Sequence, residues 1–293
     1  MPTPVIKWIG GKTQLLPIIR NYMPKTYNNY YEPFVGGGAV FLDIMPTRPK
    51  RVFINDINRS ISNLYGCIKT GSEKLIELLN AYYKYTPNTE EAYYAMRDKY
   101  NAMIQNNDYN GITAALMIWL NKNCFNGLYR VNRKGLFNAA WNHTIIEDRD
   151  EFIKLKQKDY DNIREVGKYL YENNVTIMNG DFDFPCPVPC ENDFVYIDSP
   201  YIPESKTANF TKYTKDMFNM VDHKRLSDYV KFLTKRGAKV MCSNNDVPLV
   251  HELYKDFNII SFSAKRKVNR DASKRTGQEV LITNYIDYKG EQK

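Results

Sequence analysis

The clearest chemical signal in the sequence is the run FVYIDSPYIP, residues 194–203, in which an apolar strand leads directly into Asp198, Ser199, Pro200 and Tyr201. Open α/β sheets bind ligands at the carboxyl ends of their strands, which is where Asp198 is expected. A carboxylate and a backbone carbonyl can accept both hydrogens of an exocyclic amino group, while the Tyr201 ring stacks on the planar base that carries it. The alternative is an ordinary strand-ending turn, since Asp, Ser and Pro are common turn residues.

A second signal is the glycine-rich turn in YYEPFVGGGAVF, residues 30–41. A predicted strand runs into the consecutive glycines 36–38, and a predicted helix follows. Glycines let a ligand approach the backbone, and the helix N-terminus offers free N–H groups. Asp56 stands eighteen residues after Gly38, at the predicted end of the next strand. Doubly wound folds place the acid that binds ribose hydroxyls there, so the combination predicts a site for an adenosine-type ligand.

A third segment, KWIGGK at residues 7–12, is followed by Thr13 and contains the letters GKT of a P-loop. That motif needs a glycine where Ile6 stands, and a strand before the loop, so we exclude it. What remains is a glycine pair flanked by Trp8 and Lys12, ahead of the first predicted strand. By itself this pattern predicts no more than a surface turn with a buried Trp.

The elements that must position these residues alternate between strands and helices, which is typical of βαβ units around a mostly parallel sheet. Leu226, Val230 and Leu233 share one face of an amphipathic helix predicted for residues 222–236, which Gly237 ends. The expected strands cover residues 30–34, 51–54, 175–178, 193–197, 238–242, 258–262 and 279–285.

The segment from about residue 60 to residue 149 breaks this alternation. Helices are predicted for residues 72–85, 89–105 and 112–120, and the polar stretch NKNCFNGLYRVNRKGLFNAAWN that follows is typical of a hairpin or loop. We therefore predict one α/β domain formed by residues 1–59 and 150–293, with a helical insertion at residues 60–149.

Composition narrows the class of protein. The chain has 41 Lys and Arg residues against 33 Asp and Glu, and this net charge of +8 suits a polyanionic partner without establishing one. The longest apolar run, residues 114–120, is too short to cross a bilayer, and the N-terminus lacks the apolar core of a secretory signal. Five cysteines and three scattered histidines form no disulfide framework and no metal-ligand pattern. We expect a cytoplasmic protein without a metal or a membrane partner.

The motifs KWIGGK, EPFVGGG, NDIN, CFNGLYRVN, GLFN, GDF, DSPY and TANFTKY, in this order and spacing, resemble the Dam-type adenine-N6 DNA methyltransferases of the D12 class. The resemblance covers about residues 5–286, with the motif order of the family's α group. It implies an α/β fold, a Rossmann-like S-adenosylmethionine-dependent methyltransferase sheet with an inserted helical target-recognition domain. The implied reaction transfers a methyl group from S-adenosylmethionine to N6 of an adenine flipped out of double-stranded DNA.

The resemblance also implies roles for individual residues. The catalytic motif would be Asp198, Ser199, Pro200 and Tyr201. The cofactor-binding residues would be Trp8, Lys12, Phe34, Gly36, Gly38, Asp56, Asp181, Phe182 and Asp198, with Asp56 on the ribose. DNA would be bound at the recognition hairpin by Lys122, Asn126, Leu128, Arg130, Asn132 and Arg133, although a solvated surface role stays open for Lys122 and Arg133. The basic run at residues 265–275 would add phosphate contacts from Lys267, Arg270 and Arg275, the alternative being a solvated loop.

Two positions depart from the family's pattern. The acid motif usually reads Asp-Pro-Pro-Tyr, and here Ser199 takes the second position, which keeps the backbone carbonyl but loosens the turn. Residues 138–143 read Asn-Ala-Ala-Trp-Asn-His where GATC-methylating members have Asn-Val-Pro-Phe-Gly and a basic residue. The close match of FNGLYRVN predicts a short target containing GATC, and the second departure predicts a changed preference at its outermost base.

Two other functions stay open at this point. The first is a DNA-binding protein that has lost catalysis, with Ser199 as the trace of that loss. The second is the same chemistry on RNA or on a protein amide nitrogen, against which the helical insertion and its hairpin argue. The resemblance implies a monomer and is compatible with a cognate restriction endonuclease as a partner.

Overall fold

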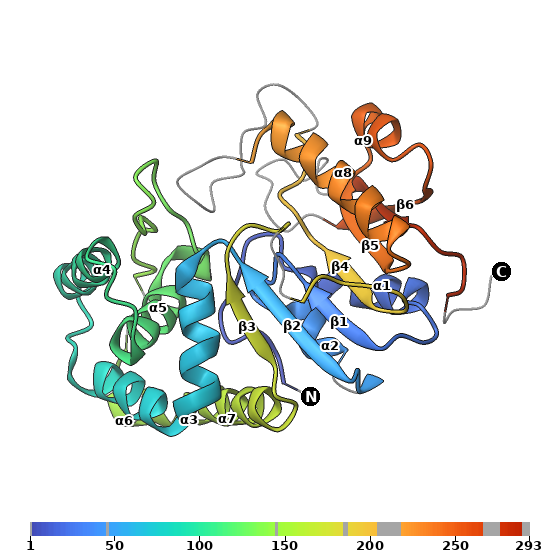
Figure 1. Ribbon diagram of the computed structural model, residues 1–293. Coiled ribbons are helices and arrows are strands. Elements are labelled where there is room, and N and C mark those ends of the chain that lie inside the picture. The colour runs from blue at the N-terminus through green and yellow to red at the C-terminus, as the bar shows by residue number, and fades with distance from the viewer. Residues whose placement is uncertain are drawn as a thin grey trace.

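The computed structural model describes residues 2–44, 47–143, 146–183, 187–203, 218–265 and 276–288. These residues form a seven-stranded sheet with the order β3-β2-β1-β4-β5-β7-β6 (Figure 1). The strands are β1 (Asn29–Glu32), β2 (Arg51–Asp56), β3 (Thr176–Asn179), β4 (Phe194–Ile197), β5 (Lys239–Asn245), β6 (Asn258–Lys265) and β7 (Thr276–Thr283). The first five are parallel, and β7 is antiparallel to both its neighbours.

This strand order reverses direction between β1 and β4, which creates a switch point at their carboxyl ends. The sheet is parallel at its centre, and the antiparallel β7 is inserted between β5 and β6. The fold class that the sequence predicts is confirmed. All seven expected strands are present within a few residues of their predicted bounds, because each is a short apolar run ended by turn residues.

The helices are η1 (Lys12–Gln14), α1 (Leu16–Tyr22), α2 (Ala39–Asp43), α3 (Arg59–Tyr85), α4 (Glu90–Gln105), α5 (Gly111–Asn123), η3 (Phe125–Gly127), α6 (Arg149–Leu155), α7 (Gln157–Glu172), α8 (Met220–Lys235) and α9 (Pro248–Leu253). Helices α4, α5 and α8 match predicted segments. The helix predicted at residues 72–85 is the second half of α3, whose helical geometry is interrupted at Gly71.

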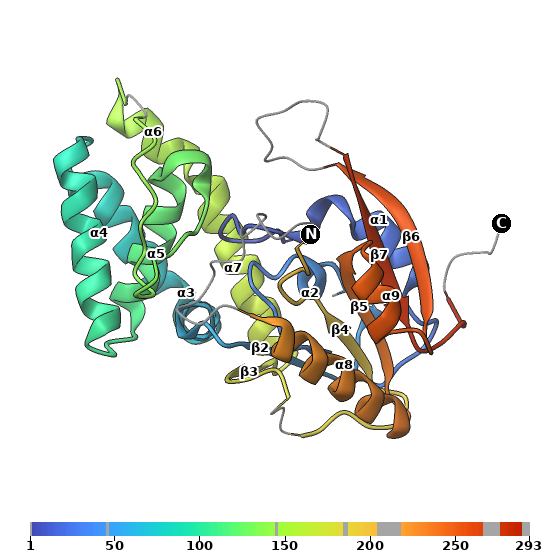
Figure 2. The ribbon, with the colours of Figure 1, turned by 90° about the horizontal axis from the view of Figure 1, so that it is seen from above.

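The central strands β1, β2, β4 and β5 are buried on both faces, which is why most of their residues are apolar, whereas the edge strands β3 and β6 are partly exposed. Side chains alternate across the sheet, so Tyr30 and Tyr196 face one hydrophobic cluster with α1, α2, α3 and α7. Tyr31 and Val195 face the other cluster, with α8 and α9. Figure 2 shows α8 on one side of the sheet and α2 and α7 on the other. Residues between two such layers can reach solvent only at the ends of the strands.

The helices α3 to α6 gather beside β3 as a lobe (Figure 1). The first half of α3 packs against the sheet at β3. Ser62 Oγ donates to the Met178 carbonyl at 2.8 Å, and Lys69 Nζ donates to the Val175 carbonyl at 2.8 Å. Apolar residues of the lobe and of the sheet share one core cluster. The predicted boundary near residue 60 therefore stands at the start of a helix that joins lobe and sheet, and the domain bounds stay a prediction.

The polar stretch after α5 forms the predicted hairpin. Backbone bridges pair Cys124 with Trp141 and Val131 with Phe137 in antiparallel fashion. Asn126 has a left-handed φ of 58° at the start of the hairpin, and Gly135 a φ of 78° at its tip. A hairpin of this kind projects polar side chains beyond the packed lobe.

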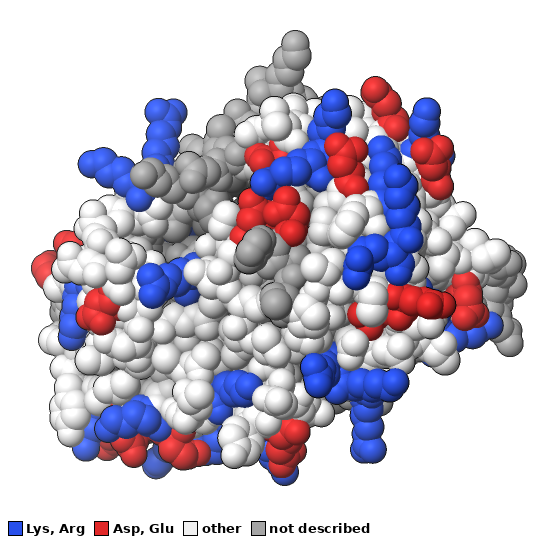
Figure 3. All heavy atoms as spheres, in the orientation of Figure 1, with Lys and Arg blue, Asp and Glu red and all other residues white. Residues whose placement is uncertain are grey.

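Charges of both signs are interspersed on the face seen in Figure 3. The net charge of +8 therefore does not by itself mark a binding surface there. Among the described helices, none combines the length and apolar character needed to cross a membrane.

Candidate active site

The acidic turn that the sequence singles out lies at the carboxyl end of β4. Asp198 Oδ1 forms an ion pair with Lys12 Nζ at 2.7 Å and accepts a hydrogen bond from Ser243 Oγ at 2.9 Å. The side chains of Lys12 and Asp198 are 7% and 19% exposed, so water screens their interaction little. Burial raises the pKa of Asp198 above its ordinary value, and Lys12 and Ser243 oppose that rise.

Tyr201 lies under the same ammonium group. Lys12 Nζ is 4.6 Å from the centre of the Tyr201 ring, and the Tyr201 hydroxyl donates to Glu279 Oε2 at 3.0 Å. The backbone of the turn is held from β5, since Ile202 N donates to Asn244 Oδ1 at 2.9 Å. These bonds fix the orientation of the ring without the second proline that the family pattern has.

The glycine turn and Asp56 meet as the sequence predicts. Asp56 Oδ2 accepts from Gly36 N at 2.9 Å, and its Oδ1 accepts from Asn58 N at 2.8 Å. Burial raises the pKa of Asp56 to about 6, although both backbone bonds lower it. Gly38 has a φ of 75°, and a Cβ there would lie 2.3 Å from the Tyr65 hydroxyl. The turn therefore requires glycine both for its conformation and for space.

Trp8 does more than fill a surface turn. A Cβ on Gly36 would lie 2.7 Å from Trp8 Nε1, and one on Gly37 would lie 2.9 Å from Trp8 Cβ. The indole thus packs directly on the glycine turn. Its ring also stacks on Tyr129 of the hairpin, with centres 4.8 Å apart. The N-terminal segment therefore touches the glycine turn, the acidic turn and the hairpin.

Glu32 is a site residue that the sequence analysis missed. It ends β1, is 3% exposed and accepts a hydrogen bond from the Tyr30 hydroxyl at 2.6 Å. Burial raises its pKa well above the ordinary value, and the charge of Asp198 adds to the rise. Its place in EPFVGGG, directly before the glycine turn, was the available signal. Ser243, by contrast, lies within β5 with no motif around it.

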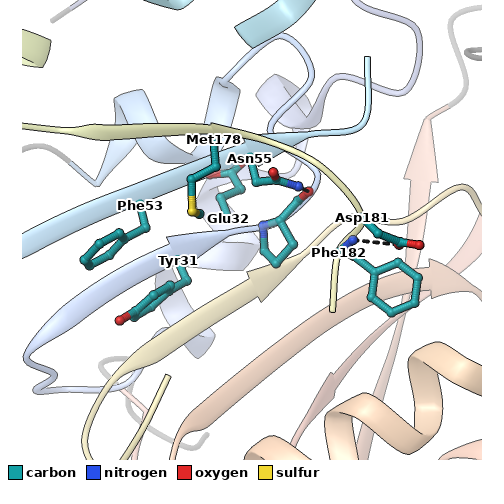
Figure 4. Close-up of a pocket in the computed structure, with 8 residues that line it drawn as sticks. Tyr31, Glu32, Phe53, Asn55, Met178, Asp181 and Phe182 are labelled. Carbon is teal, nitrogen blue, oxygen red and sulfur yellow. Dashed lines mark hydrogen bonds between the residues drawn. The ribbon is translucent and has the colours of Figure 1, made fainter. Parts of the chain in front are cut away.

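The GDF segment lies between strand ends and α8. Asp181 accepts two hydrogen bonds from Arg225 Nη2, at 2.9 and 2.8 Å, and the Arg225 guanidinium lies 4.5 Å from the centre of the Phe182 ring. Phe34 stacks on Phe182 at 5.5 Å. Figure 4 shows Asp181 and Phe182 at the rim of a pocket that Met178 and the ends of β1 and β2 line. That pocket holds about 10 Å³, room for roughly one water molecule, so it is no ligand site by itself.

The predicted hairpin residues differ in exposure. Asn126, Arg130 and Arg133 are exposed, whereas Leu128 and Asn132 are half-buried. Arg130 Nε donates to Asn138 Oδ1 at 3.1 Å, which steadies the guanidinium across the hairpin.

The side chain of Asn132 is used within the turn. Its Oδ1 accepts from Lys134 N at 2.8 Å and from Leu136 N at 3.2 Å. The exposed Phe125, 61% accessible next to Asn126, is a further surface group that the sequence analysis did not single out.

Other predicted contacts fall elsewhere. Lys122 Nζ is paired with Asp159 of α7 at 3.0 Å, away from the hairpin tip. Lys267, Arg270 and Arg275 lie outside the described residues, as does the TANFTKY motif. Within the described part of the chain, no group of three or more His, Cys, Asp or Glu side chains is arranged to hold a metal ion.

Comparison with known proteins decides the family. The sequence model of the D12 class N6 adenine-specific DNA methyltransferases matches residues 8–268. The chain belongs to this family.

Relatives of this chain are named as type II methyltransferases or as DNA adenine methylases. The type II methyltransferase M1.LlaDCHI of Lactococcus lactis subsp. cremoris is 39% identical over 285 residues, covering 96% of this chain and 95% of the relative. The type II methyltransferase M.MjaIII of Methanocaldococcus jannaschii is also 39% identical, over 96% and 99% of the two chains. The DNA adenine methylase of Haemophilus influenzae is 27% identical over 95% and 92%. The predicted family and the predicted enzyme class, an adenine-specific DNA methyltransferase, are confirmed.

For a D12-class methyltransferase the charge balance of the site is informative. Glu32, Asp56 and Asp198 end three neighbouring parallel strands or follow them directly, and Lys12 is the cation that the structure places on Asp198. Burial raises the pKa of all three carboxyl groups, so each of them gains from a nearby positive charge. Three acidic side chains therefore lie at adjacent strand ends, and Lys12 is paired with one of them.

Proposed function

We propose that the enzyme transfers a methyl group from S-adenosylmethionine to N6 of an adenine turned out of duplex DNA, within a site containing GATC. One observation carries the proposal: a largely buried carboxylate, Asp198, and an aromatic ring, Tyr201, are held together at the carboxyl end of β4, which pairs with the strand β1 that leads into the glycine turn. The carboxylate and the ring offer an acceptor and a stacking surface to an amino-substituted base.

The residues present fit S-adenosylmethionine. The turn of glycines 36–38 carries no side chain toward the strand ends, Asp56 offers carboxylate oxygens for ribose hydroxyls, and Glu32 offers a buried carboxyl for an ammonium group. Ile57, 56% exposed next to Asp56, supplies apolar surface for an adenine ring. When bound, S-adenosylmethionine supplies an electrophilic methyl group on a positively charged sulfur.

The protein's part in the transfer is positioning and charge. Asp198 accepts one hydrogen of the adenine amino group, and the backbone carbonyl of Ser199 accepts the other. These acceptors draw the nitrogen lone pair out of conjugation and stabilise the positive charge that grows on nitrogen as it attacks. Asp198 Oδ2 then receives the released proton, which its raised pKa favours.

Lys12 occupies part of this space in the structure, because its ammonium group contacts both Asp198 and the ring of Tyr201. A base stacked on the same face of Tyr201 displaces that ammonium group. The amino group of adenine then replaces Lys12 as the donor to Asp198. Asp198 therefore has a hydrogen-bond donor both before and after the base binds, so its carboxylate is never left unpaired.

The hairpin supports DNA as the substrate. Asn126 and Arg130 project from it into solvent, and a guanidinium can bind O6 and N7 of guanine in the major groove. The resemblance of FNGLYRVN to the GATC-methylating members of the family supports GATC as the target. Residues 138–143, which depart from the family pattern, are expected to alter the preference at the outermost base of the target.

The direct test is incubation with labelled S-adenosylmethionine and duplex DNA, followed by nucleoside analysis for N6-methyladenine. Mapping modified adenines in a methylation-free host that expresses the chain then reads the target. Modified adenines mostly outside GATC would contradict the target assignment and leave the chemistry intact. Duplex binding without label incorporation would identify a DNA-binding protein that has lost catalysis, and incorporation into RNA alone would change the substrate class.

A further inference from the structure

Tyr129 lies between two residues of the recognition hairpin and points the opposite way. Leu128 has extended backbone angles, and side chains alternate along an extended chain. Arg130 is therefore exposed on one side, while Tyr129 is 2% exposed on the other. Its aromatic ring reaches inward from the DNA-facing segment.

Tyr129 is connected to the glycine turn through Trp8. The two rings stack with centres 4.8 Å apart and planes 23° apart. The indole also packs on the backbone of Gly36 and Gly37, so closely that a Cβ on either residue would lie within 2.9 Å of Trp8. No side chain separates the stacked pair from the turn proposed to hold the cofactor.

A second contact joins the same two places. Asn58 Nδ2 donates to the Tyr129 hydroxyl at 3.4 Å, and Asn58 N donates to Asp56 Oδ1 at 2.8 Å. Asp56 also accepts the N–H of Gly36. The ring of Tyr129 is thus connected to the glycine turn through Trp8, and its hydroxyl is connected to Asp56 through Asn58.

The base of the hairpin is held rigidly to the N-terminal segment by one buried amide. Asn121 Oδ1 accepts from Lys7 N at 2.8 Å, and its Nδ2 donates to the carbonyls of Lys7 and Gly127 at 2.9 and 3.0 Å. Asn121 is 1% exposed, so these bonds are not exchanged with water. Trp8 therefore cannot shift without moving the base of the hairpin.

We propose that Tyr129 is a positioning residue that couples the two binding sites, so that cofactor bound on the glycine turn strengthens DNA binding at the hairpin. This inference rests on the proposed function. A ligand on the glycine turn restricts Trp8 and Asn58, and through both of them fixes Tyr129 and its neighbours Leu128 and Arg130. DNA then meets an ordered hairpin, and by linkage DNA tightens the cofactor by the same factor.

The test measures directly the factor by which DNA lowers the Kd of a cofactor analogue. Calorimetry gives the Kd of S-adenosylhomocysteine, which cannot react, for the full chain alone and in the presence of saturating duplex containing GATC. For the unaltered chain we expect the two values to differ by at least about fivefold. For Tyr129→Leu we expect the Kd without DNA to stay within about threefold and the factor to fall below about twofold. Tyr129→Phe keeps the stack and is expected to keep most of the factor.

Tyr160→Leu is the matched control. Tyr160 is a tyrosine of α7, 5% exposed, whose hydroxyl contacts Asn80 and not the N-terminal segment. It should show a similar loss of thermal stability with an unchanged factor. If Tyr129→Leu does not fold, Trp8→Leu decides instead, because it removes the same stack from the other side and should lower the factor below about twofold, whereas Tyr129→Phe should keep most of it.

An unchanged factor in the folded variants, or a factor near one in the unaltered chain, would overturn the coupling. Failure of the proposed function looks different, since the unaltered chain would then bind either no S-adenosylhomocysteine or no duplex containing GATC when each is titrated alone.

Discussion

Asp198 is the residue on which the proposed chemistry depends most. We expect Asp198→Ala to lower kcat for methyl transfer by more than about a hundredfold, because it removes the acceptor for the amino group and for its proton. The substitution also leaves Lys12 buried without its carboxylate, so circular dichroism and thermal unfolding must show that the variant folds. Asp198→Asn keeps the shape of the side chain and should be nearly as inactive. More than a few per cent of the original turnover in either variant would contradict the role of Asp198.

Tyr201 is expected to act through its ring. Tyr201→Phe keeps the stacking surface and loses only the hydrogen bond to Glu279, whereas Tyr201→Ala loses both. Base–aromatic stacking is worth roughly 1–3 kcal/mol, so the Ala variant should lose about tenfold or more in kcat/KM beyond the Phe variant. Steady-state kinetics on one duplex compare the two. Equal losses in both would assign the role to the hydroxyl.

Asp56 gives the site a pH dependence. Its pKa is raised to about 6 by burial, so the carboxyl group carries a proton below that pH and offers fewer acceptors to ribose hydroxyls. The Kd for S-adenosylhomocysteine should therefore be about tenfold higher at pH 5 than at pH 7.5. Asp56→Asn should bind more weakly and show no such change over this range. If the Kd of Asp56→Asn changed with pH as much as that of the unaltered chain, Asp56 would not be the titrating group.

At the scale of elements, replacing two helical glycines by alanine should have opposite effects on the free energy of unfolding. Helix α7 crosses α3 closely at Gly167, where a Cβ would lie 2.0 Å from Ser72 Oγ and 2.8 Å from the Ile68 carbonyl. Gly167→Ala should lower the free energy of unfolding by about 1–3 kcal/mol, despite the better helix propensity of Ala. Gly66→Ala on α3, which would meet nothing within 4 Å, should raise it by about 0.5–1 kcal/mol. Urea denaturation measures both, and a stable Gly167→Ala protein would show that α7 can shift away from α3.

At the scale of the whole molecule, the net charge of +8 acts through particular side chains. Arg133 is exposed near the hairpin tip, whereas Lys122 is neutralised by Asp159. Arg133→Met should weaken DNA binding about equally on all sequences and reduce the salt dependence of log K by about one unit of slope. Lys122→Met should leave that slope unchanged. Titrations at several salt concentrations distinguish them, and equal slopes for both variants would place the phosphate contacts elsewhere.

The sequence by itself determined the family, the sheet and the ends of its strands. These follow from local patterns: apolar runs ended by turn residues, a glycine triplet in which Gly36 and Gly38 have left-handed φ, and motifs whose order is set along the chain. Asp56 and Asp198 could be placed at strand ends for the same reason. Parallel strands share one edge, so residues that follow them converge.

Only the tertiary structure decided which side chains meet. Lys12 lies on Asp198 and Tyr201, Trp8 stacks on Tyr129, and Lys122 pairs with Asp159, each across a long separation in sequence. Such pairings depend on how the helical lobe and the N-terminal segment pack against the sheet, and no local pattern encodes that packing. The raised pKa values of Glu32 and Asp56 have the same origin, because burial is a property of the assembled core and not of the residue.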